Sequence, residues 1–271
     1  MTELPLLTDA QLTLENRVAE LTFTRDDVRN ALTGTALVED IIATLGWCNR
    51  NANVSVLILT GAGSAFSAGG NVKQMRDREG IFAGRVIEIQ DQYRRGIQQL
   101  PLAMAQSEIP LIAAVNGPAI GAGMDLACMC DLRLGSTRSL FGETFVNLGL
   151  VPGDGGAWFL PRIVGLQRAA ELIFSGRLVK ADEAKDLGIL LEITTDADLL
   201  PRARQLATEI AAKPPQALRL CKRLLQSGQR LGLADFLDQS AAFQAMAHDC
   251  EDHLEAVNAF LEKRPPQFRG K

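Results

Sequence analysis

The sequence predicts an α/β core followed by a helical C-terminal section, and two observations lead to this fold class. Over the first part of the chain, short apolar runs and glycine-rich turns alternate with segments of helical spacing. From residue 166 onward the spacing of apolar side chains is mostly helical. Because alternating strands and helices build an α/β unit, the 271-residue chain is expected to hold one such unit with a helical appendage.

The individual elements follow from apolar periodicity and from the residues that interrupt it. Alternation over residues 11–24, interrupted at 15–17, predicts an opening hairpin. Apolar runs predict strands at 54–59 and 111–115, with a further short strand at 132–134. Helical segments are expected at 35–49, 81–105, 124–130, 169–174, 181–187, 198–212, 216–226, 234–247 and 251–261.

Composition and charge exclude several classes of protein. The chain has 47% hydrophobic and 22% charged residues, as an average globular protein does. Its net charge of −4 argues against a general nucleic-acid binder. No secretory signal is expected at the N-terminus, and the apolar runs are too short to span a membrane. The five cysteines form no CxxC pair, which indicates neither zinc nor disulfides, so a cytoplasmic setting is expected.

The turn GAGSAFSAGG, residues 61–70, follows the predicted strand 54–59 as the phosphate loop of a dinucleotide-binding fold would. A Rossmann fingerprint requires GxGxxG, with the third glycine close to the start of a helix. Phe66 stands where that third glycine is needed, and the glycines resume only at Gly69 and Gly70. The main chain therefore makes a second tight turn at these glycines instead of entering a long helix. For this reason we reject a nicotinamide-binding site.

Three segments carry a more specific pattern. They are GAGSAFSAGGN at 61–71, NGPAIGAGMDLA at 116–127, and FG at 141–142 followed by LGLVPGDGGAW at 148–158. In order and spacing they resemble the three signatures of the crotonase superfamily, the family of enoyl-CoA hydratases and isomerases. RNAL at 29–32 and FLEKRPPQF at 260–268 also match the family's pattern, so the resemblance covers nearly the whole chain.

This resemblance implies a crotonase-like (ClpP/crotonase) fold. A spiral of ββα units over residues 1–200 would bind coenzyme A and hold the catalytic groups. A helical section over residues 201–271 would mediate assembly into a homotrimer or a dimer of trimers. The implied ligand is an acyl-CoA thioester, bound as the substrate, with no separate cofactor, no metal, no nucleic acid and no membrane as partner.

The chemistry of a thioester enolate explains the glycine-rich turns. Negative charge develops on the thioester oxygen, and two backbone N–H groups aimed at that oxygen would stabilise it. Such donors need close approach of the main chain, which favours glycine and alanine. By position in the motifs, the resemblance assigns the donors to Gly70 and Ala122. It places Ala68, Gly69 and Gly121 beside them at the substrate.

The acid–base groups depart from the family's pattern. Hydratases of the family hold one water between two carboxylates. The first is expected at Asp125, one helical turn after Ala122 and on the same face. The second would fall at Phe145, which has no proton to give. Asp154, on a glycine-flanked turn, is expected to replace it, although this residue could instead be a helix N-cap. Glu143 is the second candidate.

The remaining candidates concern substrate binding. Ala31, Asn71 and Phe145 lie within the matched motifs and are expected at the substrate. Lys73 occupies a position where the family often has a cation near the CoA adenine and phosphates. Phe260 and Lys263 resemble C-terminal residues that reach a neighbouring subunit's CoA site. The two histidines lie outside every motif, so histidine-based catalysis is not expected.

These features predict hydration of 2-enoyl-CoA to 3-hydroxyacyl-CoA, the type of reaction used in fatty acid β-oxidation, with Asp125 and Asp154 as the acid–base pair. A Δ3–Δ2-enoyl-CoA isomerase is the alternative, because one carboxylate suffices as a proton shuttle and the Phe145 ring would exclude water. A catalytically silent CoA-binding subunit is a third hypothesis. The chain retains both glycine-rich turns that would supply the N–H donors, and this argues against a silent subunit.

Overall fold

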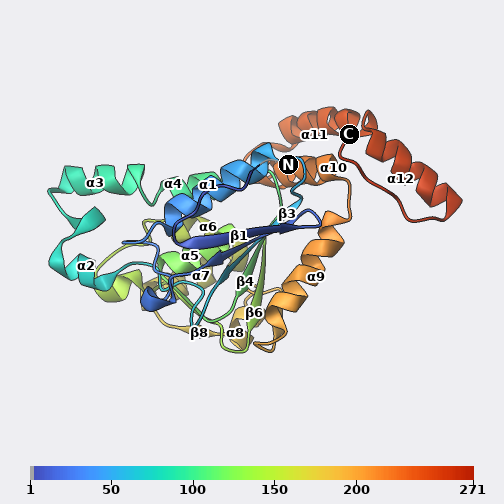
Figure 1. Cartoon of the computed structure of the whole chain (residues 1–271). Coiled ribbons are helices and arrows are strands. Elements are labelled where there is room, and N and C mark those ends of the chain that lie inside the picture. Colours follow the sequence, from blue (N-terminus) through green and yellow to red (C-terminus); the bar gives the residue numbers. More distant parts are fainter. Residues whose placement is uncertain (1–2) are drawn as a thin grey trace.

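The computed structural model describes residues 3–271 and has the α/β core and helical C-terminal section that the sequence predicts (Figure 1). A six-stranded sheet has the order β1-β2-β3-β4-β6-β9. Its strands are β1 Ala10–Glu15, β2 Val18–Phe23, β3 Val56–Gly61, β4 Leu111–Val115, β6 Leu132–Ser136 and β9 Glu192–Thr194. The β1–β2 pair is the expected antiparallel hairpin, and the other four pairs are parallel.

The helices agree with most of the expected segments. They are α1 Leu37–Arg50, α2 Val72–Asp77, α3 Val86–Arg95, α4 Gln99–Ala105, α5 Ala122–Met129, α6 Gly156–Val164, α7 Leu166–Ser175, α8 Ala181–Asp186, α9 Leu199–Ala211, α10 Pro215–Ser227, α11 Leu233–His248 and α12 Glu251–Glu262. The expected helical stretch 81–105 is divided, because Gly96 leaves helical geometry between α3 and α4. Within residues 3–271, no helix combines the length and the apolarity needed to traverse a bilayer.

Both faces of the central strands β3 and β4 are buried, which explains why these strands are mostly apolar. Leu57 and Leu59 of β3 lie in one core, which also contains buried residues of α1 and α4. Val56 and Ile58, on the opposite face, lie in a second core with residues of α9. The period of two along β3 therefore divides its side chains between two helical layers.

Helix α9 spans residue 200, where the sequence places the end of the core. It packs against β2, β3, β4, β6 and β9. Its buried residues recur at every fourth position, and three of the four are alanines: Leu199, Ala203, Ala207 and Ala211. Small side chains let the helix lie close to the sheet. The division into 1–200 and 201–271 stays a prediction, and α9 is packed as part of the core.

A second, three-stranded sheet joins segments that are distant in the sequence. Strand β5 (Pro118–Ile120) pairs in parallel with β7 (Leu140–Gly142), which pairs antiparallel with β8 (Val179–Lys180). The loop after β3 joins β5 through a bridge between Ser67 and Ala119. The Ile120 N–H donates to the Ser67 carbonyl at 3.0 Å. This sheet therefore places the first glycine-rich turn beside the second.

The C-terminal helices are attached to the core through two buried cations on α10. The Arg219 guanidinium donates to the carbonyl oxygens of Cys48 and Asn51 at 3.2 and 3.1 Å. The Lys222 ammonium donates to the Ile109 carbonyl at 2.7 Å. Beyond α10, helices α11 and α12 extend away from the sheets (Figure 1).

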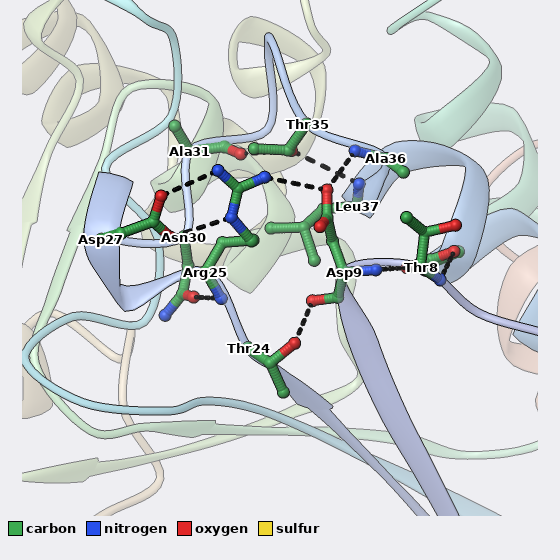
Figure 2. A network of polar contacts seen from close by, with 11 residues as sticks. Thr8, Asp9, Thr24, Arg25, Asp27, Asn30, Ala31, Thr35, Ala36 and Leu37 are labelled. Atoms are coloured by element: carbon green, nitrogen blue, oxygen red, sulfur yellow. Dashed lines mark hydrogen bonds and ion pairs between the residues drawn. The ribbon is translucent and has the colours of Figure 1, made fainter.

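The segment before α1 is held by a polar network, which Figure 2 shows. The Asp9 carboxylate accepts hydrogen bonds from the Arg25 guanidinium at 3.2 Å and from the Ala36 N–H at 2.7 Å. The Arg25 N–H in turn donates to the Asn30 side-chain oxygen at 2.9 Å. The end of β2, the start of α1 and Asn30 are thereby fixed relative to one another.

Asn30 connects this network to the first glycine-rich turn. The residue is fully buried and has φ +53°, a left-handed conformation that asparagine tolerates. Its side-chain NH₂ donates to the carbonyl oxygens of Ala62 and Ala65 at 3.0 and 2.8 Å. Nearby, the Leu32 N–H donates to the Gly69 carbonyl at 2.7 Å. The position of the turn at residues 61–70 therefore depends on Asn30.

We expect Asn30→Ala to lower the free energy of unfolding by about 2–4 kcal/mol, because it removes three side-chain hydrogen bonds and leaves buried partners unsatisfied. Urea unfolding measures this change. Asn53→Ala, at an exposed position, is the matched control and should change stability by less than about 0.5 kcal/mol. Equal effects of the two substitutions would contradict the role given to Asn30.

Candidate active site

The first glycine-rich turn and the start of α5 meet backbone to backbone. Gly69 has φ +76°, and a Cβ there would collide with the Ile120 carbonyl and lie 3.0 Å from the Ala122 nitrogen. A Cβ at Gly123 would collide with the Ser67 carbonyl. Glycine at these two positions therefore allows the approach of the two turns, and any side chain would separate them.

The N–H groups of Gly70 and Ala122 are the expected donors, and this approach brings the two residues together. Both residues lie in the wall of one cavity. Within residues 3–271, neither N–H donates a hydrogen bond. Ala122 is the first residue of α5, where helix N–H groups lack intrahelical partners and the helix dipole is positive. Two unpartnered donors at one cavity can hold an oxygen that becomes negatively charged.

This cavity has a volume of about 90 Å³ and contains six of the residues expected at the site. These are Ala68, Gly70, Gly121, Ala122, Phe145 and Asp154. Most of the other side chains in the wall are apolar. The cavity adjoins a wider groove of about 1200 Å³, and both include Val72, Met75, Phe82, Tyr93, Leu148 and Leu150 in their walls.

Among residues 3–271, Asp154 is the only carboxyl-bearing residue in the wall of this cavity. Its side chain makes no capping hydrogen bond to α6, whose N-cap is Gly155. The residue is 6% exposed, and its Oδ1 atom has no hydrogen-bond partner within residues 3–271. Burial raises the pKa of Asp154 to about 6. A carboxyl group with this pKa can accept or donate a proton close to neutral pH.

Asp125 and Glu143 form a second carboxyl site behind the cavity wall. A Cβ at Gly156 would collide with Asp125 Oδ1 and lie 2.7 Å from Glu143 Oε1, so both oxygens face the same glycine. The two carboxyl groups are within hydrogen-bonding reach of each other. When both are ionised they offer each other only acceptors. The Gly156 N–H approaches the Asp125 carboxyl, and no side chain within residues 3–271 donates to either group. One proton shared between them would satisfy both.

Burial is the main cause of the pKa shifts at this pair. It raises the pKa of Asp125 well above its ordinary range, and the nearby charge of Glu143 raises that pKa further. Burial also raises the pKa of Glu143 to about 7. Asp154 raises both pKa values through its negative charge. The three carboxyl groups thus form one cluster around Gly156, with Asp154 reaching the cavity.

The other expected residues are spread over several elements of the fold. Ala31 is buried next to Asn30. The Asn71 side chain caps α2 by accepting from the N–H groups of Lys73 and Gln74. The Lys73 side chain is exposed on α2. Phe260 and Lys263, at the end of α12, are outside the cavity wall, and Phe260 is 83% exposed. Their expected contact with a neighbouring subunit stays a prediction.

Eleven residues in the cavity wall have no counterpart among the expected ones, and three of them have identifiable contacts. Thr33 fixes the start of α2, because its hydroxyl accepts from the Asn71 N–H at 2.7 Å. Met75 lies against Gly70. Tyr93, the single tyrosine of the chain, lies beside Gly153, and burial together with Asp154 raises its pKa. Tyr93 and Met75 occur in a polar stretch without a motif, so sequence spacing carries no signal for them.

Residues 3–271 contain no group of three or more His, Cys, Asp or Glu side chains arranged to hold a metal ion. All five cysteines are unpaired. His248 and His253 contact each other at 3.0 Å on the C-terminal helices, away from the carboxyl cluster.

Comparison with known proteins agrees with this arrangement. Residues 13–271 match the family model for enoyl-CoA hydratase/isomerase. A short-chain-enoyl-CoA hydratase of Clostridium acetobutylicum is 34% identical over 95% of this chain and 96% of its own. An enoyl-CoA isomerase/hydratase of Mycosarcoma maydis is 35% identical over 94% and 93%. The crystal structure of an enoyl-CoA hydratase from Bacillus anthracis superposes with a TM-score of 0.90 at 32% identity, covering 97% of this chain and all of its own.

Because its pKa rises from 3.8 to about 6 on folding, the Asp154 carboxyl stabilises the folded state fully below about pH 4. This contribution is lost as pH rises through about 6, since the charged form is then buried. We expect the unfolding free energy of the wild type to fall by roughly 1–3 kcal/mol relative to Asp154→Asn over this window. Urea titrations at several pH values measure it, and a difference independent of pH would contradict the shifted pKa.

Proposed function

This chain belongs to the enoyl-CoA hydratase/isomerase family, and we propose that it hydrates a 2-enoyl-CoA to the 3-hydroxyacyl-CoA. The observation that carries the proposal is the small cavity whose wall contains Asp154 together with Gly70 and Ala122, two residues with N–H groups unpartnered within residues 3–271. A thioester oxygen placed at the two donors would put the adjacent carbons of the acyl chain within the same enclosed space as Asp154.

In this proposal a single carboxyl group, that of Asp154, both takes the proton from water and returns it to the substrate. Ionised Asp154 takes a proton from water as the water oxygen bonds to Cβ, and the electron pair of the double bond moves to the thioester, forming an enolate. The N–H groups of Gly70 and Ala122 stabilise the oxygen of that enolate. Asp154 then returns the proton to Cα, and the enolate collapses. The pKa of Asp154, about 6, suits both steps near neutral pH.

We propose that Asp125, together with Glu143, acts on Asp154 through its charge and does not itself exchange a proton with the substrate. The pair lies behind the wall and against Gly156, directly beyond the turn that carries Asp154. With one shared proton, the pair places a single negative charge near Asp154 instead of two. That arrangement limits the electrostatic cost of ionising Asp154, and it explains why three carboxyl groups can be buried together.

A second function, Δ3–Δ2-enoyl-CoA isomerisation, is supported by the apolar composition of the same wall. The Phe145 ring lies within 4 Å of the position that a Cβ on Gly121 would occupy, on the cavity side of α5. An apolar ring there leaves less room for a hydrating water. Asp154 would then move a proton from C2 to C4 of a 3-enoyl-CoA without water. A silent CoA-binding subunit is disfavoured, because it would not need a buried carboxyl of raised pKa.

We further propose assembly into a homotrimer or a dimer of trimers in the cytoplasm. Helices α11 and α12 carry large apolar side chains that are exposed in the single chain: Leu233, Leu237, Met246, Leu254, Phe260 and Leu261. They extend from the core (Figure 1), so a neighbouring copy could cover them. In such an assembly Phe260 and Lys263 would reach the CoA site of the neighbour, and Ala31, Asn71 and Lys73 would contact CoA within the chain.

Matched 2-enoyl-CoA and 3-enoyl-CoA substrates distinguish the two reactions. The conjugated thioester is followed by its ultraviolet absorbance, and products are identified by chromatography. Loss of conjugation with formation of 3-hydroxyacyl-CoA supports the hydratase. Gain of conjugation from the 3-enoyl substrate alone supports the isomerase. Turnover of neither substrate, with binding retained, would contradict both and support the silent subunit.

We expect Asp154→Asn to reduce turnover by about a hundredfold or more while acyl-CoA binding stays near the wild-type value, because the amide cannot exchange the proton. Steady-state kinetics and calorimetric binding measure the two quantities. Asp182→Asn, which alters an exposed aspartate on α8, is the control and should leave both unchanged. Near-normal turnover of the Asp154 variant would remove this residue from the mechanism.

We expect Gly70→Pro to lower kcat by about a hundredfold or more, because proline lacks the N–H that would face the oxyanion. Gly70→Ala keeps the N–H, and its Cβ meets only the flexible end of Met75, at 2.5 Å, so this variant should retain most of the activity. Circular dichroism and urea unfolding establish that both variants fold. Similar activity in two folded variants would show that the Gly70 N–H is not a donor to substrate.

A further inference from the structure

The groove that adjoins the active-site cavity has a charge opposite to that of the chain as a whole. The protein carries a net charge of −4. Four arginines nevertheless line this groove, and no aspartate or glutamate does: Arg76, Arg78, Arg85 and Arg94. They come from α2, from the residue that ends it, and from the start and the last turn of α3, which lie beside each other at one end of the molecule (Figure 1).

Two of these arginines are already paired. Arg76 binds Asp77 at 2.7 Å, and Arg85 binds Glu88 at 3.0 Å. Arg78 and Arg94 form no ion pair within residues 3–271. The remainder of the wall is largely apolar, and Val86 and Val151 in it are 85% and 76% exposed. The groove is therefore an apolar channel with two uncompensated guanidinium groups.

The groove lies at the end of the cavity from which an acyl chain would leave. Gly153, adjacent to Asp154, lines the groove, and Tyr93 lines both spaces. The Gln98 side chain fixes the position of Gly153, because its NH₂ group donates a hydrogen bond to the Gly153 carbonyl at 2.9 Å. A thioester oxygen at Gly70 and Ala122 sets the reacting carbons at Asp154, and the next carbons of the acyl chain then pass Tyr93 into the groove. We place the sulfur and coenzyme A on the opposite side, because Lys73, at the start of α2, does not line the groove within the described residues.

Resting on the proposed acyl-CoA function, we propose that Arg78 and Arg94 select acyl groups that end in a carboxylate, so that the substrates are ω-carboxyl acyl-CoA thioesters. The apolar wall holds the methylene chain, and the two guanidinium groups bind the distal carboxylate. Arginine is suited to this because its planar fork pairs with a carboxylate through two parallel hydrogen bonds. The groove is open to water, so the attraction weakens as salt is added.

Calorimetric binding of octanoyl-CoA and suberyl-CoA tests this proposal. Both ligands have the same chain length and are saturated, so neither needs to react, and only suberyl-CoA ends in a carboxylate. At low ionic strength the wild type is expected to bind suberyl-CoA about fivefold or more tightly than octanoyl-CoA. The double variant Arg78→Gln/Arg94→Gln should lose this preference and keep its affinity for octanoyl-CoA. Added salt should reduce the preference in the wild type only.

Arg95→Gln is the matched control, because Arg95 follows Arg94 on α3 and does not line the groove. It should retain the preference for suberyl-CoA. Equal losses of affinity for both ligands in the double variant would overturn the proposal, since the arginines would then contact coenzyme A. No preference in the wild type would also overturn it, with the acyl-CoA function intact. Binding of neither ligand would instead reject the acyl-CoA site itself.

Discussion

The close approach of the turn at residues 61–70 to the start of α5 is the constraint on which the rest of the site depends. Gly69 and Gly123 permit the contact because any Cβ would meet a backbone carbonyl of the opposite segment. The small sheet fixes it through the Ser67–Ala119 bridge, and Asn30 holds the first turn from its other side. Gly70 and Ala122, whose N–H groups are unpartnered within the described part of the chain, therefore share one cavity wall. That arrangement suits the stabilisation of a charge that appears only during reaction.

The substrate region has two parts that differ in the charged groups they contain. Around Gly156, the carboxyl groups of Asp125, Glu143 and Asp154 are buried without a cation, and their pKa values rise as a result. In the adjoining groove the charged side chains are all arginines. A buried carboxyl group of raised pKa thus lies close to a groove lined by arginines. The two parts suit a substrate that reacts at one end of its acyl chain and is recognised at the other.

The sequence predicted much of the large sheet, since β3 and β4 have long apolar runs and the terminal helices have clear periodicity. It did not predict β5, β7, β8 or β9, because two or three residues show no period. Motif order predicted that Gly70, Ala122 and Asp154 would be near one another, and they share one cavity wall. It treated Glu143 as an alternative to Asp154, whereas the structure places Glu143 against Asp125. That pairing arises from the packing of β7, α5 and Gly156, which no local pattern encodes.

The most direct test of this account is a crystal structure of the protein with a non-reacting acyl-CoA, such as octanoyl-CoA. We expect the thioester oxygen to lie about 2.7–3.1 Å from the backbone nitrogens of both Gly70 and Ala122, with the Asp154 carboxyl beside the first carbons of the acyl chain. A thioester oxygen that contacts neither nitrogen, in a fully occupied ligand, would contradict the assignment of these two turns as the reaction centre.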